Sequence, residues 1–221
     1  MAFAASQLFE RPLRSQKPGR FAPVLEPGTN ILRLERSFAP EVAEALAQVA
    51  ASPRFETHAR LDLTHLDPAE LLEPVSNQLA RQFLAEDIKS LARDFGNALG
   101  RVHLHAQLVV MTHDGCRKLH ADNVTMRLLC TYAGPGTQWL ADEHVVRNNL
   151  ARVDVDVETA NRSVVRAPGR VQTCDTADIV LLKGEAFEGN RGRGAVHRSP
   201  PIEAEGLRRL VFKIDENRCG C

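Results

Sequence analysis

The spacing of apolar residues changes near residue 100, and this change predicts how the chain is organised. Residues 40–52 begin with a proline and place apolar side chains three and four positions apart, which predicts a surface helix. Residues 63–100 contain the longest such stripe, with Asp67 expected at its N-terminus and Pro74 expected to kink or split it. The preceding residues, 1–30, are rich in proline and show neither period. We therefore expect an extended arm followed by a helical layer.

From residue 101 onward, apolar and polar residues alternate over short stretches. Residues 102–110 place Val, Leu, Ala, Leu and Val at every second position, with His103, His105 and Gln107 between the first four, which is the period of a half-buried strand. Other short strands are expected at residues 30–36, 124–132, 163–167, 170–174, 178–184, 195–199 and 207–215.

Helices followed by at least six short strands predict an α+β chain that is mainly β. The expected architecture is a double-stranded β-helix, the jelly-roll or cupin-like barrel, formed by residues 101–221. Residues 1–100 would supply the arm and the N-terminal helical layer packed on that barrel. The whole chain is expected to form one structural domain.

The composition argues against several classes of function. Lys plus Arg and Asp plus Glu each number 28, so no net charge favours nucleic acid or an anionic membrane surface. No apolar run is long enough to cross a bilayer, and the first residues lack the basic start of a secretory signal. Five cysteines without regular spacing favour a reducing compartment. We expect a cytoplasmic protein that acts on a small molecule, without nucleic-acid or membrane partners.

Two of the cysteines, Cys219 and Cys221, lie one residue apart at the end of the sequence. A solvent-exposed tail is the favoured interpretation, and transient capture of a metal ion by the two thiolates is the alternative.

The strand-rich half contains residues suited to binding a metal. His120 and Asp122 lie two apart at the start of the strand expected at 124–132, and His197 lies on a later expected strand. Two histidines and one carboxylate form the facial triad that holds non-heme iron and leaves coordination positions open for a 2-oxo acid and dioxygen. We predict these three residues as the metal ligands and catalytic centre, with Fe(II) as the metal and Zn as the alternative.

The His-x-Asp spacing has little weight by itself. A second such pair, His65 and Asp67, falls where the pattern predicts a helix N-terminus. A hydrogen-bonded structural pair at His120 and Asp122, and a strand-capping role for His197, are the alternatives to metal binding. The strand context and the distant histidine therefore matter more than the spacing.

Arginines near the predicted ligands are candidates for binding the carboxylate of a co-substrate, because a planar guanidinium matches a carboxylate with two hydrogen bonds. Arg208 shares a strand face with apolar residues, which we expect to be the inward face of the barrel. Arg209 points to the opposite face and is the weaker candidate. Arg127 is expected to reach the same cavity as an acid or substrate clamp. Ordinary ion pairs are the alternatives, with Glu203, Glu205 or Asp215 for Arg208 and with Asp142 or Glu143 for Arg127.

Two family resemblances add to these expectations. The sequence D-I-V-L-L-K-G, followed by V-H-R-S-P-P and R-R-L-V-F, resembles the distal half of Fe(II)/2-oxoglutarate oxygenases of the phytanoyl-CoA-hydroxylase-like type. The set H-A-D-N-x-x-x-R, C-T-Y-A-G-P-G-T-x-W-L, L-L-K-G-E-A-F-x-G-N and V-H-R-S-P-P is similar to a bacterial family of proteins of unknown function (DUF1826), over most of residues 100–215.

The oxygenase resemblance implies that His120, Asp122 and His197 bind iron, that Arg208 binds 2-oxoglutarate, and that an unknown substrate is oxidised. A cupin-like protein that holds zinc or another divalent metal for metal homeostasis is the alternative, and a metal-free binding domain is a third. The long loop at 185–194 departs from characterised oxygenases. It is expected to be a lid whose arginines, Arg191 and Arg193, are available to an anionic substrate.

Overall fold

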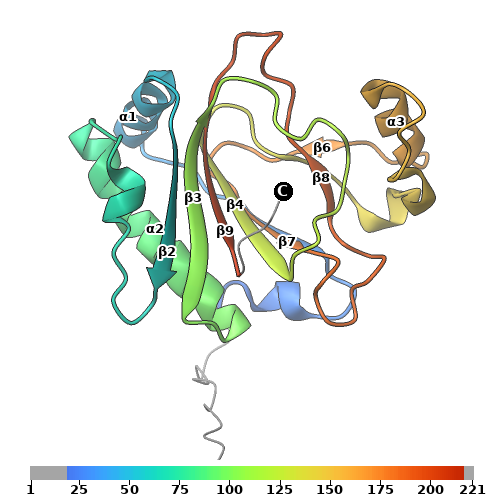
Figure 1. The fold of residues 1–221 in the computed structure, drawn as a ribbon, viewed down its shortest axis with the longest axis horizontal. Helices are drawn as coiled ribbons and strands as arrows, with labels where there is room; N and C mark the ends of the chain where they lie inside the picture. Colours follow the sequence, from blue (N-terminus) through green and yellow to red (C-terminus); the bar gives the residue numbers. More distant parts are fainter. Residues whose placement is uncertain (1–18, 217–221) are drawn as a thin grey trace, which may run out of the picture.

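The computed structural model describes residues 19–216, and Figure 1 shows its helices and strands. The α-helices are α1 (Pro40–Ala51), α2 (Gln78–Leu99) and α3 (Val157–Val164). The strands are β1 (Ile31–Leu34), β2 (Glu56–Asp62), β3 (His103–Met111), β4 (Met126–Ala133), β5 (Gln138–Leu140), β6 (Gln172–Thr173), β7 (Ile179–Lys183), β8 (Val196–Arg198) and β9 (Arg209–Asp215). Short 3-10 turns occur at Ala22–Leu25, Ala69–Leu72, Asp142–His144 and Arg147–Asn149.

The strands form two antiparallel sheets. The main sheet has six strands in the order β1-β7-β4-β9-β3-β2, and the small sheet has three in the order β6-β5-β8. The chain is therefore mainly β with helices, as predicted. In the part of the chain that the structure describes, β1 and β2 are the outer strands of an open main sheet rather than neighbours in a closed barrel. Both precede residue 100, so the sheet combines strands from the two halves of the sequence.

Helices α1 and α2 cover one face of the main sheet (Figure 1). Alternate residues of β9, namely Leu210, Phe212 and Ile214, are fully buried in the same apolar cluster as Leu84 and Ile88 of α2. Because successive strand residues point to opposite faces, the residues between them must point away from the helices. That second face of the main sheet is where the candidate site lies.

The helix predicted for residues 40–52 is confirmed as α1, whereas the stripe over 63–100 divides. Asp67 precedes only the short 3-10 turn Ala69–Leu72, where its Oδ1 accepts from the Ala69 N–H at 3.0 Å, and it does not begin the long helix. Pro74 separates this turn from α2, which begins after Asn77, whose side chain accepts from the Ala80 N–H.

The strand predicted at 163–167 is wrong, because most of it belongs to the end of α3 or follows that helix. Asp156 caps α3 by accepting from the Thr159 N–H at 2.9 Å, and Ala160 and Val164, four residues apart, are buried. The other predicted strands are present, while β2 and β5 were not predicted.

Two predictions concern the ends of the chain. Of the arm expected at 1–30, residues 1–18 lie outside the described residues. In the rest of it, Phe21 and Val24 are buried in the apolar cluster between the helices and the main sheet. Cys219 and Cys221 also lie outside the described residues. Within residues 19–216, no helix combines the length and apolarity needed to cross a bilayer.

Candidate metal centre

The backbone joins the two predicted histidine ligands directly. The N–H of His197 donates to the carbonyl of His120 at 3.0 Å, and the N–H of His120 donates to the carbonyl of His197 at 3.1 Å. Strand β5 supports this pair from the other side, because Trp139 is the register partner of His197. The two imidazole rings consequently lie with their centroids 4.6 Å apart.

Asp122 completes a cluster of three potential ligands. Its Oδ1 lies 3.5 Å from Nε2 of His120, and its Oδ2 lies 3.3 Å from Nε2 of His197. One ligand atom from each residue falls within 4.8 Å of the others. Metal–ligand distances of about 2.0–2.2 Å place neighbouring ligand atoms about 3 Å apart, so this donor set fits a single divalent ion.

Hydrogen bonds to backbone carbonyls fix the orientation of both rings. Nδ1 of His120 contacts the Lys118 carbonyl at 2.8 Å, and Nδ1 of His197 contacts the Ala195 carbonyl at 3.1 Å. Because a carbonyl oxygen only accepts, the ring proton must be on Nδ1 in both contacts. This tautomer leaves the lone pair of each Nε2 directed toward Asp122, as in histidine ligands that are held by a backbone carbonyl.

Arg127 reaches this cluster and holds the carboxylate. One guanidinium nitrogen donates to Oδ2 of Asp122 at 2.6 Å, while two others bind both oxygens of Asp215 at 2.7 and 2.8 Å. All three side chains are buried. The carboxylate partners of Arg127 are therefore Asp122 and Asp215, and not Asp142 or Glu143, which the sequence had offered as alternatives. The clamp expected for a bound acid is better described as a group that orients Asp122.

The surrounding charges keep Asp122 ionised. Burial by itself would raise the pKa of Asp122, but without a metal each imidazole, when it is protonated on Nε2 as well, donates a hydrogen bond to Asp122, and these bonds together with the charge of Arg127 hold the pKa of Asp122 well below its usual range. Burial alone would lower the pKa of His120. The hydrogen bonds of its ring to Asp122 and to the Lys118 carbonyl have the larger effect, so the pKa of His120 is raised. A carboxylate ligand must be deprotonated, and Asp122 meets this condition.

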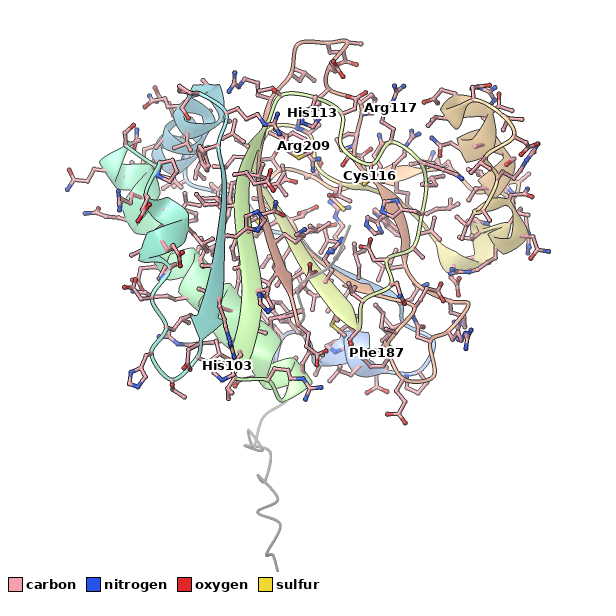
Figure 2. All side chains as sticks on the ribbon, in the orientation of Figure 1. His103, His113, Cys116, Arg117, Phe187 and Arg209 are labelled. Atoms are coloured by element: carbon pink, nitrogen blue, oxygen red, sulfur yellow. The ribbon has the colours of Figure 1, made fainter. Side chains whose placement is uncertain are left out.

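The cluster opens into a cavity of about 230 Å³ between the two sheets. Its wall combines residues from the main sheet, from the small sheet and from the loop between β3 and β4. The wall includes His113, Cys116, His120, Arg127, Leu129, Thr137, His197 and Arg209. Figure 2 shows Arg209 and His113 near one end of the main sheet, Cys116 beside them on the side of the small sheet, and His103 at the other end of the main sheet.

Arg209 is the most unusual residue of this wall. It is 2% exposed, and one guanidinium nitrogen contacts the hydroxyls of Thr131 at 3.1 Å and Thr137 at 3.4 Å. Its buried Nε finds no hydrogen-bond partner, and within residues 19–216 no carboxylate forms an ion pair with it. Burial lowers the pKa of Arg209 to about 10, which still leaves the group charged at neutral pH.

Arg208, the predicted carboxylate partner, does not face the cavity, and this prediction was wrong. Its guanidinium donates to the carbonyl of Ala50 at 2.5 Å and to that of Ser52, both at the C-terminal end of α1. The apolar face of β9 is the face covered by the helices, so sharing that face places Arg208 beside α1. The weaker candidate, Arg209, is the one that lines the cavity.

The loop at 185–194, predicted as a lid, is bound to itself and to a neighbouring turn. Glu185 accepts from the N–H groups of Gly194, at 2.9 Å, and of Gly192. Arg193 forms an ion pair with Asp142 at 3.1 Å. Neither Arg191 nor Arg193 contributes to the wall of the cavity.

Comparisons with known proteins agree with the predicted family resemblance. A family model described as a protein of unknown function (DUF1826) matches residues 15–215. No curated protein matches the sequence.

Among solved structures, a dioxygenase for auxin oxidation from rice is 13% identical, with a TM-score of 0.47, covering 85% of this chain and 73% of that one. A Pseudomonas putida prolyl-4-hydroxylase is 14% identical, with a TM-score of 0.41, covering 86% and 94%. The Fe(II)/(alpha)ketoglutarate-dependent dioxygenase TqaL is 14% identical, with a TM-score of 0.46, covering 84% and 81%. At these identities and TM-scores, the activities of those enzymes do not transfer to this chain.

Proposed function

Since the chain belongs to the DUF1826 family of proteins of unknown function, we propose a function from its site: an Fe(II)- and 2-oxoglutarate-dependent oxygenase. In this proposal the two sheets correspond to an open form of the double-stranded β-helix. The observation that favours it most is the presence, in one cavity, of the His120, Asp122 and His197 cluster and an unpaired, buried Arg209.

Each part of the cavity would have a defined task. His120, Asp122 and His197 would hold Fe(II) on one side and leave its other positions open. Iron and 2-oxoglutarate together, when bound, supply the chemistry by which dioxygen oxidises a C–H bond. Arg127 would keep Asp122 ionised and correctly oriented through its 2.6 Å hydrogen bond.

Arg209 would bind the carboxylate of 2-oxoglutarate that lies farthest from the metal. A buried guanidinium without an anionic partner is costly, and a carboxylate ligand would remove that cost by pairing with it. The hydroxyls of Thr131 and Thr137, already in contact with Arg209, would help to fix the position of the guanidinium. A doubly charged acid would therefore be held at both ends.

The same three ligands also suit a catalytic zinc ion, which requires three protein ligands and an open position. Storage of a metal ion provides no role for a buried arginine without an ionic partner in the cavity. Arg209 therefore favours the oxygenase over a zinc protein linked to metal homeostasis.

The test is an anaerobic titration with Fe(II), with and without 2-oxoglutarate, that follows the visible charge-transfer band of the chelated complex. We expect the band in the wild type and about a 100-fold higher Kd for 2-oxoglutarate in Arg209→Ala, because one partner of a buried charge pair is lost. Arg208→Ala is the matched control and should leave this Kd within about twofold. Absence of the band at saturating iron and 2-oxoglutarate in the wild type would favour the zinc protein instead.

A further inference from the structure

The cavity retains positive charge after the metal and 2-oxoglutarate are accounted for. Its wall contains five Lys or Arg residues and one carboxylate residue: Arg54, Arg127, Arg198, Arg209, Lys213 and Glu56. Of these, Arg127 is bound by Asp122 and Asp215, and Arg209 is assigned to 2-oxoglutarate. Glu56 already accepts a hydrogen bond from Gln107 at 2.6 Å. The remaining cations exceed the remaining anion, which favours an anionic ligand.

Lys213 is the cation best placed for that ligand. It lies on the cavity face of β9, and its Nζ is 4.0 Å from Oδ2 of Asp215. Both oxygens of Asp215 are already bound by Arg127 at 2.7 and 2.8 Å, so Asp215 is a weak partner for the ammonium group. An ammonium group has three donors, and the Lys213 side chain is 26% exposed. Its donors are therefore accessible from the cavity.

An apolar surface lies beside this cation. Val109 of β3 and Val211 of β9 are register partners, and both line the cavity. Lys213 is the next residue on the same face of β9 after Val211, and its register partner on β4 is Leu129. Carbon chains would pack against this floor, while an acid group reaches Lys213.

The same surface is close to the metal ligands. The pair formed by Arg127 and Asp215 follows the pair formed by Leu129 and Lys213 on the same face, two positions along the two strands. Arg127 in turn donates to Asp122. A ligand bound at Lys213 therefore lies within the cavity that contains the metal cluster, and Val211 separates Lys213 from Arg209 along the cavity face of β9.

The size of the cavity limits how much of the ligand is enclosed. Its volume of about 230 Å³ is below the range of about 300–1,000 Å³ that is usual for ligand pockets. Arg54, an exposed residue of the wall, precedes the outer strand β2, where the main sheet is open. A longer ligand would leave the cavity past this arginine.

We propose that the side of the cavity formed by β3 and β9 binds the compound that is oxidised, and that this compound is an amphipathic acid. Its anionic group pairs with Lys213, and its carbon chain packs on Val109 and Val211. This inference rests on the proposed oxygenase function, of which it names the substrate class.

The experiment compares hexanoate with its neutral analogue hexanamide on the full chain, with Fe(II) and saturating 2-oxoglutarate under anaerobic conditions. Ligand-observed NMR gives the Kd of each probe. We expect hexanoate to bind the wild type at least about tenfold more tightly than hexanamide, and Lys213→Met to abolish that preference. Lys89→Met is the matched control, because Lys89 on α2 is similarly exposed, at 27%, and pairs with Glu86 outside the cavity. That variant should bind both probes like the wild type.

The outcomes separate this proposal from the proposed function. The Kd of 2-oxoglutarate should stay within about twofold of wild type in Lys213→Met; a weakening as large as that in Arg209→Ala would assign Lys213 to the co-substrate and overturn the inference. Equal affinity for the two probes, or no binding of either probe, would also overturn it. If 2-oxoglutarate fails to bind the wild type, the oxygenase function is wrong, and a preference for hexanoate that depends on Lys213 would still support an acid-binding site.

Discussion

The two faces of β9 differ in composition and in use. Toward the helices, Leu210, Phe212 and Ile214 are fully buried in an apolar cluster. Toward the cavity, the alternate residues include Arg209 and Lys213, and also Asp215, which forms an ion pair with Arg127. Both faces are largely buried, yet only the helix-side face is apolar.

Arg208 and Arg209 show what this difference means. They are adjacent in sequence, and a step of one residue along a strand reverses the face. Arg208 lies against the carbonyls at the end of α1, whereas Arg209 lies in the cavity without a carboxylate partner in the described part of the chain. Apolar neighbours mark the face that stabilises the fold, and the polar face of the same strand contains the groups available for chemistry.

The largest effect is expected at the metal cluster. His197→Ala should reduce bound Fe(II) from about one ion per chain to background, because a lost ligand costs more than the about 10- to 100-fold loss caused by removing a group that orients one. Metal analysis after dialysis against micromolar Fe(II) measures this. His105→Ala, on the cavity-side face of β3 but outside the cluster, is the control and should bind iron like the wild type. Equal iron content in His197→Ala and the wild type would exclude this cluster as the metal site.

The helix-side face should control stability without affecting the metal. Phe212→Ala should lower the free energy of unfolding by about 3–5 kcal/mol, because it leaves a cavity in the main core. Val211→Ala, on the opposite face, removes less apolar surface and should cost about 1.5 kcal/mol. Urea unfolding compares the two, and iron content should remain unchanged in the folded fraction of both. An equal loss of stability would mean that the two faces contribute alike.

Much of the fold could be predicted from local patterns. Alternation over 102–110 identified β3, and the proline-initiated stripe identified α1. The strand expected at 163–167 failed because two adjacent valines resemble a strand, while the cap at Asp156, which sets the helix, lies seven residues before the predicted start. The pairing of β1 and β2 with strands from the second half of the chain is a long-range contact that no local pattern contains.

The sequence allowed us to predict which three residues cluster at the candidate site, but not which arginine lines its cavity. The three residues expected to bind metal do lie together, and their role as ligands stays a prediction. The choice between Arg208 and Arg209 depended on which face of β9 the helices cover. Alternation shows that two faces differ, but both faces of this strand are covered, so apolarity alone could not show which one lines the cavity.

Removing the charge of Arg127 should reduce stability and metal binding together. Arg127→Met leaves Asp122 and Asp215 buried without their shared cation, at an expected cost of about 3 kcal/mol in the free energy of unfolding. The affinity for Fe(II) should fall by about tenfold, because Asp122 loses the group that orients it. Urea unfolding and metal titration measure the two effects. Loss of stability with unchanged metal affinity would show that the bond to Asp122 has no part in metal binding.

The smallest expected effect has opposite signs at the two adjacent arginines. Without 2-oxoglutarate, Arg209→Met should raise the free energy of unfolding by about 1 kcal/mol, because it removes a buried charge that has no ionic partner among residues 19–216. Arg208→Met should lower it by about 1 kcal/mol, because the carbonyls of Ala50 and Ser52 lose their donor.

With 2-oxoglutarate at about 100 times its Kd and iron present, linkage should stabilise the wild type by about 2.7 kcal/mol. Arg208→Met should gain this increment in full, since its guanidinium faces α1 and not the cavity. Arg209→Met should gain little of it. The difference in the free energy of unfolding between the two variants should therefore become smaller or change sign when 2-oxoglutarate is added. Urea unfolding with and without the acid tests this directly. If Arg209→Met is less stable than the wild type without ligand, the buried guanidinium is already satisfied in the free protein, and its availability to a carboxylate can no longer be argued from its burial.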